Sequence, residues 1–271
     1  CQPFSRYSSR YRKEGHTDNK WRLLYSFERL VRETLPDIVS MENVPNLIHE
    51  NVFRDFVRTL NELHYEVEYQ VVNCPDYGVP QHRKRLVLLA SRFGEIHLIP
   101  PLYDAEHYIT VRDAIGHLQP IEAGEICPDD ILHRSSALSA INMERIQQSV
   151  PGGTWRDWDE NLRLKCHRKE SGATFPSVYG RMEWDEPSPT MTTQFYGYGT
   201  GRFGHPEQNR AISLREGAIL QSFPDDYIFI DDLHPAKKRE LGTHIGNAVP
   251  VELGRAIGMS IQQHLTEMGV N

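Results

Sequence analysis

The sequence predicts an α/β fold: the second half of a doubly wound sheet, with a smaller, loop-rich domain inserted. Within residues 1–92, the patterns of a helix, a strand, a helix and two more strands follow one another. Between about Phe93 and Gly204, prolines and glycines divide the chain into short segments, and helical patterns return afterwards. We therefore expect a first domain over 1–92, an inserted domain over 93–204 and a return to the first domain over 205–271.

Apolar spacing and helix-breaking residues give the elements of the first domain. A helix is expected over 20–34, capped by Asn19 and ended by Pro36. Its buried face is expected to be Trp21, Leu24, Phe27, Leu30 and Val31. The next expected elements are a buried strand over 37–44, a helix over 49–63, a strand over 66–73, a turn over 74–80 and a strand over 85–90.

Further helices are expected later in the chain, over 111–118, 138–148, 213–222 and 250–265. Ser213 can cap the third of these. The last is expected to bury Leu253, Ile257, Ile261 and Leu265.

The composition is that of an ordinary globular chain and narrows the function classes. The chain has 271 residues, 39% of them hydrophobic, with no apolar run of about 18 or more, so we expect no membrane span. Its start shows no basic region followed by an apolar run, so we expect no secretory signal. A net charge of -7 excludes a strongly basic nucleic-acid coat, although an acidic enzyme can bind DNA through a local basic groove. The four cysteines show no Cys-x-x-Cys spacing, so we expect reduced cytosolic thiols and neither a disulfide framework nor a metal site.

Cys1 is the candidate nucleophile. A lone cysteine is more often a small buried apolar residue, but a thiolate is stabilised by nearby positive charge. Gln81, Arg83 and Arg85 alternate along an expected strand and should share one face. The alternative is a basic edge strand that prevents aggregation.

Glu42 lies at the end of the expected buried strand, where α/β sheets bind ligands. Its carboxyl group could give or share a proton with a ring nitrogen, or it could be a solvated helix-capping group. A cysteine, a carboxyl group and arginines together suit attack on an electron-poor heterocycle.

Five stretches, in this order, resemble the motifs of the DNA cytosine-5 methyltransferases. Cys1-Gln2 is similar to the second part of the family's Pro-Cys-Gln motif, and Glu42-Asn43-Val44 to Glu-Asn-Val. The other three are Gln81-x-Arg83-x-Arg85, the run from Arg215-Glu216 to Leu220-Gln221-Ser222-Phe223-Pro224, and Gly246-Asn247-Ala248-Val249. The resemblance implies a class I methyltransferase sheet of the Rossmann type, with 93–204 as an inserted target recognition domain.

The resemblance also implies roles for the residues. Cys1 would add to C6 of a flipped cytosine, and Glu42 would contact N3 and the exocyclic amine. Arg83 would position Cys1 and the base, with Arg85 in support. Asn247 and Ala248 would approach the methionine end of the cofactor, S-adenosyl-L-methionine.

The expected partner is double-stranded DNA. The DNA contacts implied are those of Ser5 and Arg6, in a loop over 5–19 that closes on DNA, together with Gln81, Thr190 and Arg202. A bacterial member would act in the cytoplasm at the nucleoid, in a restriction-modification system.

The family's cofactor motifs come before the catalytic cysteine, and this sequence begins at Cys1. We therefore expect a truncated or processed chain that is inactive alone, or a separate N-terminal chain that carries those motifs. Two alternatives stay open: a non-catalytic DNA-binding remnant and an RNA cytosine methyltransferase.

Overall fold

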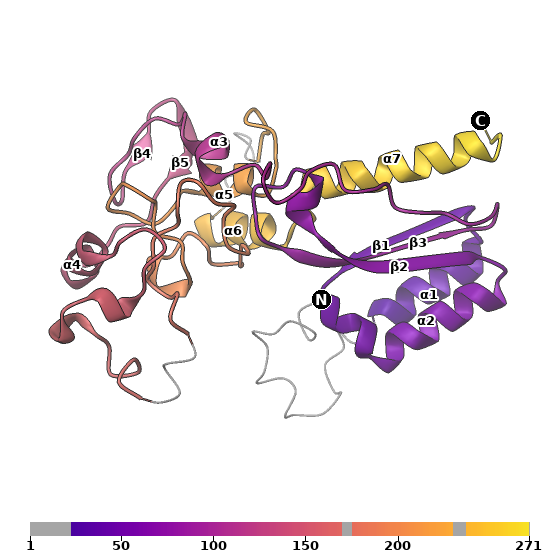
Figure 1. The fold of residues 1–271 in the computed structure, drawn as a ribbon, viewed down its shortest axis with the longest axis horizontal. Coiled ribbons are helices and arrows are strands. Elements are labelled where there is room, and N and C mark those ends of the chain that lie inside the picture. Colours follow the sequence, from indigo (N-terminus) through magenta and orange to yellow (C-terminus); the bar gives the residue numbers. More distant parts are fainter. Residues whose placement is uncertain (1–22, 170–174, 230–236, 271) are drawn as a thin grey trace. The chain divides into compact units, whose positions relative to one another are not determined.

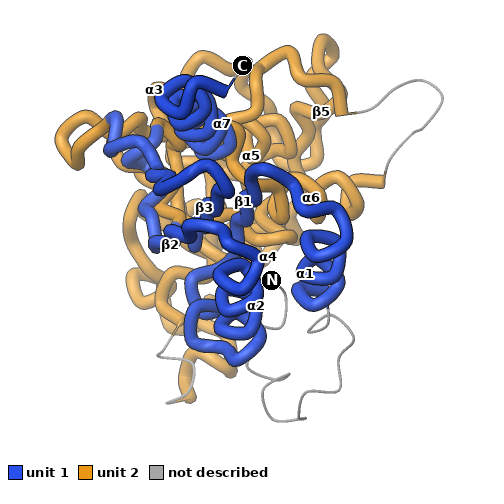
Figure 2. The backbone as a smooth tube through the Cα atoms, turned by 90° about the vertical axis from the view of Figure 1, so that its right-hand side faces the viewer, with its two compact units in different colours: residues 1–77, 84–102, 253–271 blue, residues 78–83, 103–252 orange. Residues whose placement is uncertain are grey.

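The computed structural model describes residues 23–169, 175–229 and 237–270. The chain divides into two compact units, shown in blue and orange in Figure 2. Unit 1 comprises the described residues up to Tyr77, together with 84–102 and 253–270, and unit 2 comprises 78–83 and the described residues of 103–252.

Unit 1 is a three-stranded sheet with helices on both faces (Figure 1). Its elements are α1 (Leu23–Thr34), β1 (Ile38–Asn43), α2 (Asn51–Glu62), β2 (Glu66–Asn73), β3 (Lys84–Ser91) and α7 (Val251–Glu267). Helices α1 and α2 cover one face and α7 covers the other (Figure 1). The predicted order of elements is therefore confirmed in this part of the chain.

The pairing of the strands departs from a simple doubly wound sheet. The order is β1-β3-β2, and β3 is antiparallel to both neighbours. Strands β1 and β2 therefore run in the same direction, joined through α2 as parallel strands require. The connection from β2 to β3 is residues 74–83, which hold a 3₁₀ turn at Cys74–Tyr77 and no crossover helix, so β3 returns antiparallel.

The core of unit 1 corrects two predicted helix faces. In α1, Val31 is buried and Leu24 and Phe27 pack on the core. Leu30, which was predicted to be buried, faces outwards and is 47% exposed. In α7, the buried stripe is Leu253, Ala256, Ile257, Ser260 and His264, in place of the predicted Ile261 and Leu265.

Hydrogen bonds explain the polar residues of that stripe. The Ser260 hydroxyl accepts from the Ile99 amide (2.9 Å), and His264 bonds the Ser91 hydroxyl (2.7 Å). Buried polar groups with such partners are tolerated in a core. Apolar periodicity alone misses them.

Unit 2 is built from short elements around a separate core. They are α3 (Val111–Ile115), the antiparallel pair β4 (Ile126–Cys127) and β5 (Asp130–Arg134), α4 (Ala140–Gln148), α5 (Leu214–Leu220) and α6 (Lys238–Asn247). Other 3₁₀ turns lie at Pro45–His49 in unit 1 and at Trp155–Asp157, Glu160–Leu162 and Tyr198–Thr200 in unit 2. None of the helices in the described ranges is long and apolar enough to cross a membrane.

The units group the chain differently from the predicted boundaries at 92 and 204. Residues 205–252, predicted to return to the first domain, belong to unit 2, as do Gly78–Arg83. The reason is one shared core: Leu214, Leu220 and Ile245 of α5 and α6 pack with Met191 and Phe195 from the predicted inserted domain. The functional boundaries stay a prediction.

Close packing in this core requires glycine in α5. A Cβ at Gly217 would lie 2.0 Å from the ring of the fully buried Phe195. Real Cβ contacts are never this short, so the ring can pack there only against glycine.

We expect Gly217→Ala to destabilise the protein by about 1–3 kcal/mol, because the added methyl group overpacks the core. The matched control is Gly254→Ala in α7, where a Cβ meets nothing within 4 Å. That change should add about 0.5–1 kcal/mol through helix propensity. Denaturant unfolding measures both, and equal stability of the two variants would contradict the packing described.

Candidate functional site

The predicted site residues divide between the two units. Cys1, Ser5 and Arg6 lie outside the described residues. Glu42 and Arg85 belong to unit 1. The remaining ones belong to unit 2: Gln81, Arg83, Thr190, Arg202, Asn247 and Ala248.

Glu42 and Arg85 form an ion pair near the end of β1. Arg85 Nε lies 2.7 Å from Glu42 Oε1, and the side chains are 12% and 16% exposed. Glu42 faces Val87 across the ladder, so Arg85 reaches it along the diagonal. Burial lowers the pKa of Arg85, and the Glu42 carboxylate opposes that shift. The pair holds the Glu42 carboxyl group in one orientation at the strand end.

Arg83 lies in unit 2 and is 4% exposed. Its Nη1 donates to the Met191 carbonyl (3.1 Å) and to Gln81 Oε1 (3.3 Å). Its Nη2 donates to the carbonyls of Gly246 and Ala248, at 3.4 Å each. One guanidinium thus joins three stretches that are far apart in the sequence.

Residues 80–83 do not continue strand β3, which begins at Lys84. They pair with the segment 188–190 instead: the Ser188 amide donates to the Pro80 carbonyl (3.0 Å), and the His82 amide to the Ser188 carbonyl (2.8 Å). The expectation that one strand carries Gln81, Arg83 and Arg85 on a shared face is therefore wrong. Of the three, only Arg85 lies in the strand.

Thr190 and Met191 are held against this segment. The Thr190 hydroxyl donates to the His82 carbonyl (2.5 Å), and the Met191 amide donates to Gln81 Oε1 (2.8 Å). The structure thus brings the predicted residues Gln81, Arg83 and Thr190 together within unit 2.

Gln81 is completely buried. Its Nε2 donates to the Leu220 carbonyl and to Gln221 Oε1, both at 3.0 Å. These contacts make Gln81 a structural link in this conformation, and its contact with DNA stays a prediction. Arg202 lies elsewhere in unit 2, 3.8 Å from the Glu183 carboxylate.

The Gly246-Asn247-Ala248 stretch forms the carboxyl end of α6. Glycine is required at position 246 because a Cβ there would lie 2.3 Å from the Thr192 carbonyl oxygen. Asn247 is exposed and Ala248 is half-buried, so both can be reached by a ligand. The carbonyl end of a helix favours positive charge, which suits the guanidinium of Arg83.

Gln221 was not singled out from the sequence as a site residue. Its side chain is fully buried at the end of α5, and its Nε2 donates to the Ile245 carbonyl (2.8 Å) and the Gly246 carbonyl (3.3 Å). Ser222 follows with a positive φ of 59°, an uncommon conformation outside glycine. The Leu-Gln-x-Phe-Pro pattern contains this glutamine, but its partners are set by the fold.

Helix α5 is fixed at its start by Glu216. The Ser213 hydroxyl and the Glu216 carboxylate form a capping box, as the predicted Ser213 cap requires. Both Glu216 oxygens also bond Arg210, at 2.6 and 2.7 Å, and the two side chains are fully buried. Burial raises the pKa of Glu216, but the hydrogen bonds and charge of Arg210 outweigh this and lower the pKa to about 2.

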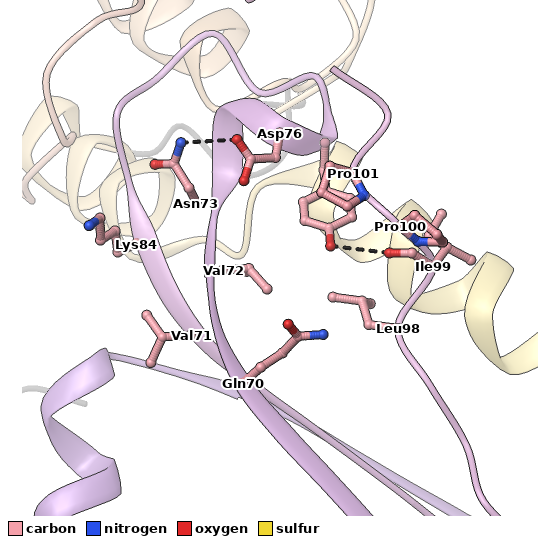
Figure 3. A pocket seen from close by; sticks show the side chains of 11 residues that line it. Gln70, Val71, Val72, Asn73, Asp76, Lys84, Leu98, Ile99, Pro100 and Pro101 are labelled. Carbon is pink, nitrogen blue, oxygen red and sulfur yellow. Dashed lines mark hydrogen bonds between the residues drawn. The ribbon is translucent and has the colours of Figure 1, made fainter. Parts of the chain in front are cut away.

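A cavity of about 390 Å³ lies in unit 1 between β2 and the segment 98–101 (Figure 3). Asn73 donates to Asp76 (3.1 Å) at its rim, and the Tyr77 hydroxyl donates to the Ile99 carbonyl (3.2 Å). Among the predicted site residues that the structure describes, none lines this cavity.

The fold of the chain is similar to that of a solved structure. That structure, described as a DNA modification methyltransferase encoded within an Escherichia coli prophage, matches with a TM-score of 0.69. The match has 21% sequence identity and covers 92% of this chain and 75% of that chain.

The chain belongs to the C-5 cytosine-specific DNA methylase family, which it matches over residues 1–263. It is 53% identical to the type II methylase M.HgiDII of Herpetosiphon aurantiacus over 98% of this chain and 74% of that protein. It is 34% identical to the type II methyltransferase M1.HphI of Haemophilus parahaemolyticus, over 96% of this chain and 66% of that protein. The resemblance found in the sequence motifs is confirmed, whereas the expected separate N-terminal chain finds no support in these matches.

We expect Glu216→Gln to lower the free energy of unfolding near neutral pH, because Arg210 loses its buried charge partner. The folded pKa of about 2 lies below the ordinary value of 4.5. The carboxylate therefore contributes stability above pH 4.5 that is lost as the pH falls through 2. Denaturant titrations should show the difference between wild type and variant shrinking over this interval, and a difference that does not change with pH would contradict the ion pair.

Proposed function

We propose that the protein methylates C5 of cytosine in duplex DNA, as the modification enzyme of a restriction-modification system. The observation that carries the proposal is the Glu42–Arg85 pair near the end of β1, in a chain that belongs to the cytosine-5 methylase family. The pair presents a carboxyl group at the sheet edge where α/β folds bind ligands.

Cys1 and Glu42 act on the cytosine ring in successive steps. The Cys1 sulfur adds to C6 of the flipped cytosine, and Glu42 shares a proton with N3 to neutralise the charge that the addition places on the ring. Carbon C5 then accepts the methyl group that S-adenosyl-L-methionine would supply, with S-adenosylhomocysteine as the leaving group, and the C5 proton passes to solvent. The bond between C6 and sulfur breaks, which restores the ring double bond and the free thiolate.

The carboxyl end of α6 fits part of S-adenosyl-L-methionine, which supplies the methyl group when bound. Asn247 is exposed there and offers an amide, and Ala248 is accessible beside it. We assign the methionine end of the cofactor to these two residues.

Arg83 is assigned to positioning Cys1 and the base, with Arg85 in support through Glu42. Thr190 and Arg202 are assigned to DNA from unit 2, with Ser5 and Arg6 from the segment before the described residues. The Thr190 assignment is supported by its bond to the His82 carbonyl, one residue before Arg83.

We expect Cys1→Ser to abolish methyl transfer and to leave DNA affinity within a few-fold of wild type, because a serine hydroxyl is a much weaker nucleophile at its ordinary pKa. The protein as its gene encodes it, with any segment before Cys1 included, is mixed with radiolabelled cofactor and duplex DNA. Methyl incorporation and DNA binding are measured side by side. Turnover by the serine variant at the wild-type rate would refute the assignment of Cys1.

Duplex DNA, single-stranded DNA and a structured RNA serve as parallel substrates in the same assay. Incorporation into duplex DNA is the expected result. Incorporation into RNA alone would favour an RNA methyltransferase, and DNA binding without incorporation by the wild type would favour a non-catalytic DNA-binding protein.

A further inference from the structure

The side chain of Gln221 is fully buried, and both the nitrogen and the oxygen of its amide form hydrogen bonds. Gln221 is not among the residues predicted to act in catalysis, cofactor binding or DNA binding. It stands between two stretches with assigned roles. On one side are the carbonyls of Ile245 and Gly246, at the end of α6. On the other side is the amide of Gln81.

The partners fix which way each amide points. The carbonyls of Ile245 and Gly246 can only accept, so the Gln221 nitrogen must face them. Its oxygen then faces Gln81, and Gln81 must offer its nitrogen in return. The Gln81 oxygen is left to accept from Arg83 Nη1 (3.3 Å) and from the Met191 amide (2.8 Å).

The result is a directional chain of hydrogen bonds from the carboxyl end of α6 to the segment 188–191. Carbonyls in the last turn of a helix lack partners within the helix, and here Gln221 and Arg83 supply them. The Gln81 nitrogen has two acceptors, the Gln221 oxygen and the Leu220 carbonyl (both 3.0 Å). Removing the Gln221 amide takes one of them away, and so loosens the side chain whose oxygen accepts from Arg83. The orientation of Arg83 thus depends on Gln221, which is linked to it through Gln81.

We propose that Gln221 is a positioning residue for Arg83, and that this amide chain couples cofactor occupancy at 246–248 to DNA occupancy at 188–191. The inference rests on the proposed function, because that function assigns the cofactor to one end of the chain and DNA to the other. A coupling of this kind is reciprocal: each ligand raises the affinity of the other by the same factor.

The test compares Gln221→Met with Gln81→Met and with the double variant. Methionine keeps the length and volume of glutamine but cannot form the two amide bonds. The matched control is Ile219→Val, which removes one buried methylene group from the same helix and leaves the amide chain intact. All variants are made in the protein as its gene encodes it, and unfolding curves establish the folded fraction of each.

Two readouts separate positioning from a structural role. The first readout is kcat per folded molecule, measured at saturating DNA and cofactor. We expect Gln221→Met to lower kcat about 10- to 100-fold, because a catalytic group that is slightly misplaced loses much of its effect. The second is the factor by which S-adenosylhomocysteine tightens binding to duplex DNA. We expect this factor to fall towards one in Gln221→Met and to stay at the wild-type value in Ile219→Val.

The double variant tests whether the two glutamines act as one chain. If they do, Gln81→Met/Gln221→Met is no slower than the worse single variant, because either change breaks the same path. Wild-type kcat and wild-type coupling in folded Gln221→Met would overturn the inference. Should Gln221→Met fail to fold, Gln81→Met cuts the next link and is judged by the same two readouts.

The proposed function fails in a different way. A wild-type protein that transfers no methyl group to DNA refutes that function, whatever the variants do. A wild-type protein that transfers methyl groups, with a Gln221→Met variant equal to it in both readouts, refutes the positioning role alone.

Discussion

The guanidinium of Arg83, bonded to carbonyls of Met191, Gly246 and Ala248, is the interaction on which the arrangement of unit 2 depends. A buried charge is costly unless hydrogen bonds replace its water. Here the carboxyl end of α6 supplies acceptors of the favourable sign, because carbonyl dipoles at a helix end attract positive charge. The charge therefore holds the end of a helix and a loop segment to one another.

Several motif residues are explained by this requirement rather than by contact with a substrate. Gly246 lets the backbone of Thr192 come close enough for the three carbonyls to converge on Arg83. Glu216 fixes the start of α5 through Arg210 and the Ser213 cap, and so sets the place of Gln221 at its other end. The motifs of the family can thus contain structural residues, which hold other residues in position, as well as residues that take part in the reaction.

The sequence predicted most of unit 1 because its signals are local. Alternating residues gave the strand at 66–73 without error, and Pro36 marked the end of α1 near Thr34. The sequence could not place β3 between β1 and β2, because pairing order depends on connections in space and not on any one segment. Leu30 was assigned to the core by spacing, and the structure turns it outwards.

The site was predictable as a set of residues and not as a geometry. Period two linked Gln81, Arg83 and Arg85, but residues 80–83 leave the strand to pair with 188–190, more than a hundred positions away. Helix α6 was missed because its few apolar residues, Leu241 and Ile245 among them, lie between charged residues and glycines. Gln221 lies within a motif of the family, but the motif does not give its role, because that role comes from the partners that the fold brings to it.

Native-state hydrogen exchange on Arg83→Met tests the central claim most directly. If the guanidinium holds both stretches, the amides of 188–193 and of 245–251 should lose protection together, while those of β3 and α4 keep it. Loss of protection in only one of the two stretches, or in neither, would show that they are held independently and would contradict the account.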